Sequence, residues 1–225
     1  MGPTGPIFTG RRIPMPRLII ATLAWMLPLA VQACELAPGA DCAGADLEGR
    51  DLARQQLQGI NLSHANLRHA DLRHADLRGA NLAGADLSHA RLTRAILEKA
   101  NLRGATLNEA NMVSIRGWAL FGQGARFNRT RLDGADLSFA RLSNARFEQA
   151  SLYAASLEMA WMTKARMIRS NLQDADLQEA KFNNASLEGA DLTGANIRFA
   201  TFQDTWMEGC TGCPLDWMIP KHPVE

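Results

Sequence analysis

The clearest pattern in the chain is a large apolar residue at every fifth position. In the stretch DLRHADLRGANLAGADL, residues 71–87, leucine stands at positions 72, 77, 82 and 87. Alanine stands two places before each of these leucines, and aspartate or asparagine stands one place before. A helix has a period of 3.6 residues and a strand a period of 2, so a period of five fits neither. The pattern runs from residue 45 to residue 207 with one interruption, and it predicts a repeat array in which one large and one small residue of each five fill a narrow core.

The repeated motif, A-(D/N)-L-x-x, resembles that of the pentapeptide-repeat family. Its central apolar residues run from Leu47 to Met112 and again from Phe127 to Met207. The resemblance implies an all-β fold, a right-handed quadrilateral parallel β-helix in which four pentapeptides make one square coil of 20 residues. About eight coils with capped ends are expected, each contacting mainly its neighbours.

The spacing of the phenylalanines agrees with a 20-residue coil. Phe127 and Phe147 are central residues 20 positions apart, and so are Phe182 and Phe202. We therefore expect each pair of rings to stack on one side of successive coils.

The motif lapses over residues 113–126, where Gly117 and Gly122 occupy two successive central positions. The gap is a multiple of five, so the repeat resumes in phase. The lapse predicts an irregular or bulged side in the middle of the rod, with Trp118, Leu120 and Phe121 refilling the core.

The two ends of the chain differ from the repeat. Residues 1–33 are typical of a signal peptide, because Arg11, Arg12 and Arg17 precede the apolar run 18–29 and small residues precede Cys34. A membrane anchor that is not cleaved is the alternative. The remaining regions predicted are an N-terminal cap at 34–44, the β-helix at 45–209 and a C-terminal cap or tail at 210–225.

Four cysteines in an exported chain favour disulfide bonds. A solenoid holds its two ends too far apart for a bridge between them, since bridged Cα atoms lie within about 7 Å. The pairs predicted are therefore Cys34–Cys42 and Cys210–Cys213. Lipidation of Cys34, which follows a loose lipobox, is the alternative for that residue and implies a membrane-anchored lipoprotein. The CxxC at the C-terminal end has no second CxxC or following histidine pattern to support zinc or haem.

Charge and motifs argue against several classes of function. The formal charge is +1, but the chain from Cys34 onward carries 21 basic and 23 acidic residues and is therefore close to neutral. No general field steers such a chain to nucleic acid, so electrostatic recognition has to be local. No Ser/His/Asp order, phosphate loop or HExxH motif is present, and a filled rod offers no deep pocket. The sequence thus predicts a non-enzymatic protein without a cofactor.

Residues 20 apart become neighbours on the surface of a β-helix, and one region of the surface is then basic. Two adjoining columns are formed by residues that stand one place before the central residues. Arg129, Lys164 and Arg169 lie on the same sides of the coil. A solvated face relieved by Glu148, Glu188 and cation–π contacts is the plainer alternative. The residues predicted to bind a partner are Arg126, Arg141, Arg146, Trp161, Lys164, Arg166 and Lys181.

Histidines gather in the N-terminal half, each at the last place of its pentapeptide. His69, His89 and Glu109 are 20 residues apart and form one column, which is a candidate site for Zn²⁺ or Cu²⁺. The plainer interpretation is that histidine is tolerated at an exposed corner.

Together these features predict an exported interaction or scaffold protein of the bacterial cell envelope, located in the periplasm or outside the cell. Its partner is expected to be an anionic envelope polymer, a lipid headgroup or an acidic protein surface, and not a nucleic acid. A periplasmic metal-binding protein that uses the histidine column is the alternative. Some family members resemble B-form DNA and inhibit DNA gyrase, but that role needs a strongly acidic rod in the cytoplasm, which this sequence does not favour.

Overall fold

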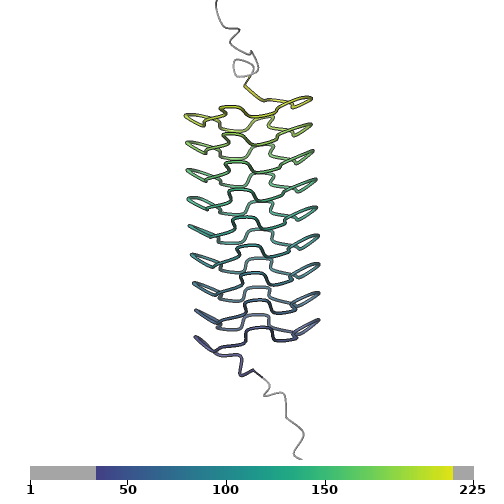
Figure 1. The fold of residues 1–225 in the computed structure, drawn as a ribbon, viewed down its shortest axis with the longest axis vertical. Coiled ribbons are helices and arrows are strands. Elements are labelled where there is room, and N and C mark those ends of the chain that lie inside the picture. Colours follow the sequence, from purple (N-terminus) through teal and green to yellow (C-terminus); the bar gives the residue numbers. More distant parts are fainter. Residues whose placement is uncertain (1–33, 215–225) are drawn as a thin grey trace, which may run out of the picture. The chain divides into compact units, whose positions relative to one another are not determined.

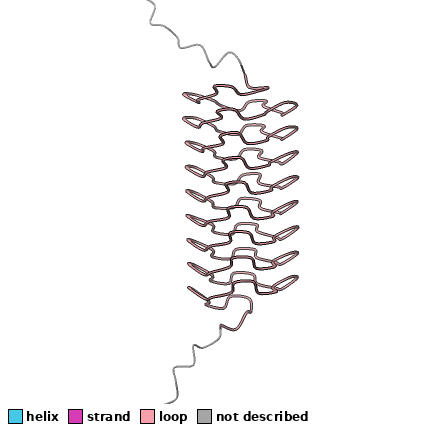
Figure 2. Cartoon of the chain, turned by 90° about the vertical axis from the view of Figure 1, so that its right-hand side faces the viewer, coloured by secondary structure: helices cyan, strands magenta, loops and turns pink. Residues whose placement is uncertain are grey.

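The computed structural model describes residues 34–214, and within this range the chain forms a stack of similar coils (Figure 1). The described residues contain no helix and no strand longer than a single bridge. Figure 2 shows the same stack turned by 90°, with the described residues drawn throughout as loops and turns. The predicted signal peptide at 1–33 and the tail at 215–225, including Asp216 and Trp217, lie outside the described residues.

Parallel bridges join each coil to the next with a constant step of 20 residues. They begin with Asp41↔Asn61 and continue at every fifth residue to Asp191↔Thr211, so each step contains four bridge positions. Each bridge uses two backbone hydrogen bonds, as where Leu62 N donates to Asn81 O at 2.7 Å and Asn81 N donates to Ile60 O at 2.8 Å. The backbone groups along the stack are satisfied by the neighbouring coils, as a β-helix requires.

A tight turn follows every central residue and closes each pentapeptide. Ala65 N donates to Leu62 O at 3.1 Å, and His64 at the third position of that turn has a φ of 57°. This combination is characteristic of a type II turn, which places its third residue in the left-handed region. The same position is left-handed throughout the repeat and is occupied by glycine or by residues such as Lys99, Glu109 and Arg129.

The large and the small inward residues of each pentapeptide form one continuous core. The central leucines and the alanines two places before them are buried from residue 57 to residue 192, and Ala195 and Ala200 near the C-terminal end are partly buried. Phe127 stacks on Phe147 with ring centroids 4.7 Å apart, and the Phe182–Phe202 rings are 5.2 Å apart and nearly parallel. The predicted aromatic stacks are therefore confirmed.

The predicted bulge at 113–126 is wrong. Arg116 and Phe121 form bridges in the ordinary step, to Asp136 and Arg141, and the turns continue without interruption. Leu120 occupies a small inward position, is fully buried, and fills the space that the two glycines leave. Trp118, in contrast, is 40% exposed and does not refill the core.

The first coil is open to solvent, and it includes residues 41–44 of the predicted N-terminal cap, because Asp41 already forms a bridge to Asn61. Arg50 and Gln55, which stand where other pentapeptides have alanine, are both exposed. Leu36 and Ala40 pack against the hydrophobic core from the N-terminal side. Cys34 is bonded to Cys42 with Cα atoms 5.3 Å apart, and Cys210 is bonded to Cys213 with Cα atoms 5.8 Å apart.

Candidate functional site

Charge is divided between the sides of the stack. The basic faces consist of residues 121–130, 141–150, 161–170 and 181–190, which lie above one another through the bridges Phe121↔Arg141↔Trp161↔Lys181 and Arg126↔Arg146↔Arg166↔Ser186. They carry eight basic and two acidic residues, a net charge of +6. The acidic faces, residues 131–140, 151–160, 171–180 and 191–200, carry two basic and seven acidic residues, a net charge of −5. The near-neutral total therefore hides a strong local separation of charge.

The structure brings all the predicted partner-binding residues together on the basic faces. Arg141, Trp161 and Lys181 form one column, and Arg126, Arg146 and Arg166 form the next. Lys164 lies at the turn between the two columns. The side chains of all seven are exposed: Arg126, Arg141, Arg146, Trp161, Lys164, Arg166 and Lys181.

Aromatic rings alternate with the cations of the first column. The Lys181 Nζ lies 4.4 Å from the centre of the Trp161 ring, and the Arg141 guanidinium lies 5.4 Å from the centre of the Phe121 ring. Trp161 is nevertheless 50% exposed, so one face of the indole remains accessible. The arrangement offers a flat apolar surface between positive charges.

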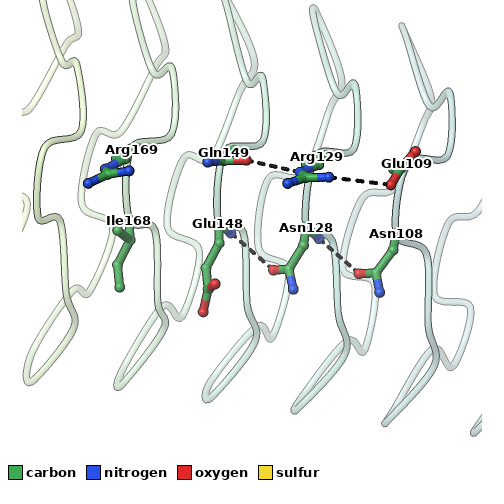
Figure 3. A pocket seen from close by; sticks show the side chains of 8 residues that line it. All are labelled: Asn108, Glu109, Asn128, Arg129, Glu148, Gln149, Ile168 and Arg169. Atoms are coloured by element: carbon green, nitrogen blue, oxygen red, sulfur yellow. Dashed lines mark hydrogen bonds and ion pairs between the residues drawn. The ribbon is translucent and has the colours of Figure 1, made fainter.

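A shallow groove of about 390 Å³ runs along the rod beside the arginine column (Figure 3). It is lined by two parallel columns that cross four coils. The residues that line it are Asn108, Glu109, Asn128, Arg129, Glu148, Gln149, Ile168 and Arg169.

Hydrogen bonds fix the amide column of the groove. The Asn108 side-chain oxygen accepts from Asn128 N at 3.2 Å, and the Asn128 oxygen accepts from Glu148 N at 3.1 Å. Because the oxygens are used in this way, both amide NH₂ groups are left to donate outward. The groove thus has two neutral donors beside its arginines.

The second column of the groove consists of one acidic, one amide and two basic side chains: Glu109, Arg129, Gln149 and Arg169. Arg129 lies 3.8 Å from Glu109 and donates to the Gln149 side-chain oxygen at 2.9 Å. Arg166 is paired with Glu148 at 3.2 Å. Among the described residues, Arg126, Arg146 and Arg169 form no ion pair, so their charges remain available to a ligand.

Sequence reasoning singled out the arginines of this region but missed the groove itself. The groove is lined in part by the uncharged amides of Asn108, Asn128 and Gln149, which a search for charged or catalytic residues does not select. The signal available in the sequence was the 20-residue spacing of Asn108 and Asn128, which places the two amides one above the other.

The histidine column forms, with a geometry that disfavours a shared metal ion. The rings of His69 and His89 stack in parallel with centroids 4.9 Å apart, and His89 Nδ1 lies 3.5 Å from Glu109 Oε2. Stacked rings direct their nitrogens sideways in parallel, whereas a shared ion needs them to converge. Across residues 34–214 no group of three possible ligands is placed to hold a metal ion.

The carboxyls with shifted pKa values have structural partners. The side chain of Arg73 donates to Asp71 and lowers its pKa, and the side chain of Arg78 lowers the pKa of Asp76 in the same way. Both aspartates stand one place before a central leucine and also accept from the turn backbone. A lowered pKa keeps these groups ionised, which does not suit a general acid.

No helix in the described part of the chain is long and apolar enough to cross a bilayer.

Comparison with known proteins gives a consistent family. The model for pentapeptide repeats matches eight copies, over residues 40–79, 56–94, 85–114, 123–149, 130–167 and 170–209. No curated protein matches the chain. Among solved structures, the chain is 33% identical to HetL, a pentapeptide repeat protein involved in heterocyst differentiation regulation from the cyanobacterium Nostoc sp. strain PCC 7120. That match covers 76% of this chain and 84% of HetL with a TM-score of 0.41.

A second similar structure is a trypsin-treated variant of QnrB1, a plasmid-mediated fluoroquinolone resistance protein. It is 15% identical, with 74% of this chain and 91% of that chain covered and a TM-score of 0.52. At this identity the likeness concerns the fold alone.

Proposed function

Because the chain belongs to the pentapeptide repeat family, we propose that it is a non-enzymatic interaction or scaffold protein that binds an anionic partner through its basic faces. We take the described chain to be a closed square solenoid of about eight coils, an assignment supported by four bridge positions in every 20-residue step. Proteins of this family are generally structural or interaction proteins, which agrees with the filled core.

The observation that carries the proposal is the separation of charge between the faces. A net charge of +6 on the basic faces between residues 121 and 190 gives a local field that a near-neutral total does not suggest. Its cations lie one coil apart, a spacing close to 4.8 Å. A partner with repeated anionic groups along the rod axis can therefore contact several cations at once.

The groove supplies short-range recognition beside the charge. Three side chains of the groove have N–H donors that meet no side-chain acceptor among the described residues. They are the amides of Asn108 and Asn128 and the guanidinium of Arg169. Carboxylate, sulfate and phosphate oxygens each accept such bonds. Trp161 adds an apolar surface on which a sugar ring or acyl segment can lie.

We also propose that the protein is exported to the periplasm or the cell exterior. The sequence of residues 1–33 supports this, and disulfides at both ends of the stack suit an oxidising compartment. The paired state of Cys34 favours a soluble mature protein over a lipoprotein.

The separation of charge also argues against a DNA-like role. Mimicry of B-form DNA needs acidic groups around the rod, whereas here arginine columns occupy part of the surface. The similarity to QnrB1 does not change this, since it concerns the fold.

Calorimetric titration with dextran sulfate and with phosphatidylglycerol vesicles, each at 50 and 500 mM NaCl, tests the proposal and separates two kinds of anionic partner. We expect Arg146→Glu with Arg166→Glu to weaken binding at least about tenfold, because each reversal replaces attraction by repulsion, and high salt to weaken wild-type binding. The matched control, Arg94→Glu with Arg131→Glu, changes the same charge on other sides of the rod. Equal binding by both double variants contradicts the proposal, as does wild-type protein that binds neither probe.

A further inference from the structure

A separate side of the rod carries most of the exposed large apolar residues. The ladder face consists of residues 96–99, 116–119, 136–139, 156–159, 176–179 and 196–199, joined by bridges from Ile96↔Arg116 to Asp176↔Asn196. Four of the seven exposed large apolar side chains of the described structure lie on it. They are Trp118 at 40%, Phe139 at 41%, Met159 at 37% and Phe199 at 67% exposure.

Trp118, Phe139 and Met159 lie on successive coils and form an apolar strip, from which Phe199 is separated by Glu179. The rings of Trp118 and Phe139 are 5.9 Å apart at their centroids, and Lys99 lies over Trp118 at 5.2 Å. Phe139 and Met159 occupy the same left-handed turn position one coil apart, so both project outward. Exposed apolar strips with a polar border are typical of protein interfaces.

We propose that the ladder face is the interface of an antiparallel homodimer. The two-fold axis crosses the face between the level of Phe139 and the level of Met159. This symmetry places each column opposite the same column of the second copy, running in the reverse direction. Levels 96–99, 116–119 and 136–139 then face levels 196–199, 176–179 and 156–159.

Charges are complementary in this register. Glu98 faces Arg198 of the second copy, and Arg116 faces Asp176 of the second copy; by symmetry each contact occurs twice. Within one chain Arg116 is already paired with Glu98 at 2.5 Å. The dimer therefore joins these residues into two mixed-charge networks, one at each end of the strip.

The uncharged residues also match across the axis. Phe139 faces Met159 of the second copy, a favourable contact between sulfur and an aromatic ring. Phe199, the most exposed of the four, faces Lys99 of the second copy and gains a cation–π contact.

Other registers place like charges together. If Phe139 faces itself, Asp136 faces Asp136 and Arg198 faces Arg78 of the second copy. A parallel pair centred on the column of Glu158 places that residue opposite itself. The antiparallel register between Phe139 and Met159 avoids such repulsion over all six levels.

The area of the ladder face limits the expected affinity of the dimer. Six levels extend over about 24 Å, so the strip is smaller than the roughly 800 Å² per partner of a standard interface. We therefore expect a reversible dimer that dissociates in the micromolar range. The columns of Arg126, Arg146 and Arg166 belong to another side and stay accessible, so the dimer presents two basic surfaces.

Cysteine cross-linking of protein purified after bacterial expression of the full chain tests the register. Ala119→Cys and Glu179→Cys variants, mixed and mildly oxidised, are expected to form a disulfide-linked dimer. Neither variant alone should do so, because two copies of either cysteine lie three levels apart, about 14 Å, beyond the about 7 Å that a disulfide spans. Failure of the mixture to cross-link, or equal cross-linking by one variant alone, overturns the proposed register.

Sedimentation velocity from 5 to about 500 µM measures the association itself. Phe139→Glu should weaken it at least about tenfold, because a charge then enters the centre of the strip. Ala154→Glu is the matched control, since Ala154 is exposed at the same left-handed turn position on another side. Wild-type protein that stays monomeric throughout, or equal association of both variants, overturns the dimer.

Discussion

Leu120 offers the sharpest test of how the core is filled where the motif lapses. It is fully buried and stands at an inward position that alanine occupies in most pentapeptides. A Cβ added to Gly117 lies 3.0 Å from Leu137 Cδ2 and 3.5 Å from Leu120 Cδ1. A Cβ added to Gly122 lies 2.8 Å from Leu142 Cδ2 and 3.2 Å from Leu120 Cδ2. Leucine side chains already occupy the space of both missing central residues.

The expected cost of Leu120→Ala follows from this packing. Removal of three buried carbons at about 0.8 kcal/mol each gives about 2.4 kcal/mol. The cavity adds about 1–2 kcal/mol, because the neighbouring glycines have no side chains that can move into it. We therefore expect a loss of about 3.5–4.5 kcal/mol in the free energy of unfolding, in the upper range for a leucine-to-alanine change.

Denaturant unfolding followed by tryptophan fluorescence and circular dichroism, with disulfides intact, measures this loss. Gly122→Leu alone should destabilise by about 1–3 kcal/mol through overpacking. The double variant Leu120→Ala with Gly122→Leu restores the ordinary motif, and we expect it to recover more than half of the loss. A loss below about 1 kcal/mol for Leu120→Ala, or strictly additive effects, refutes the account of shared volume.

Three further predictions concern the turns, the aspartates and the ends. Gly124→Ala should destabilise by about 1 kcal/mol, because a φ of 69° is strained for alanine while the added Cβ meets nothing within 4 Å; a gain in stability contradicts this. Arg78 lowers the pKa of Asp76 below its ordinary value of 3.8. The stability lost in Asp76→Asn should therefore be constant well above pH 3.8 and shrink as the pH falls from that value through the lowered pKa. Urea unfolding of both proteins from pH 2 to 7 checks this, and a difference that shrinks near neutral pH contradicts it. Mass spectrometry of non-reduced peptides should find Cys210 bonded to Cys213 and Cys34 unacylated; free thiols or a diacylglyceryl mass reverse the assignment.

The basic columns could be predicted because a solenoid is nearly one-dimensional. Once the step is 20 residues, Arg126, Arg146 and Arg166 have to lie above one another. The ladder face follows from the same 20-residue step. Its exposed apolar residues stand at turn positions, however, and in the sequence they are not distinguished from the apolar residues of the core. The exposure of Phe139 and Met159 becomes evident only when the turn projects them outward.

The repeat, the core positions and the 20-residue step between coils follow from the amino-acid sequence alone. The period of five separates inward from outward residues at every position, and the phenylalanine spacing fixes the step that stacks Phe127 on Phe147. The filling of the core at the motif lapse and the pairing of surface charges depend on contacts between coils, which a five-residue motif does not specify. Leu120 replaces two missing central side chains because volume in the core is shared between neighbouring pentapeptides and coils. Likewise, Arg166 is paired with Glu148 while Arg146 is not, because ion pairs depend on side-chain reach across coils and not on the columns alone.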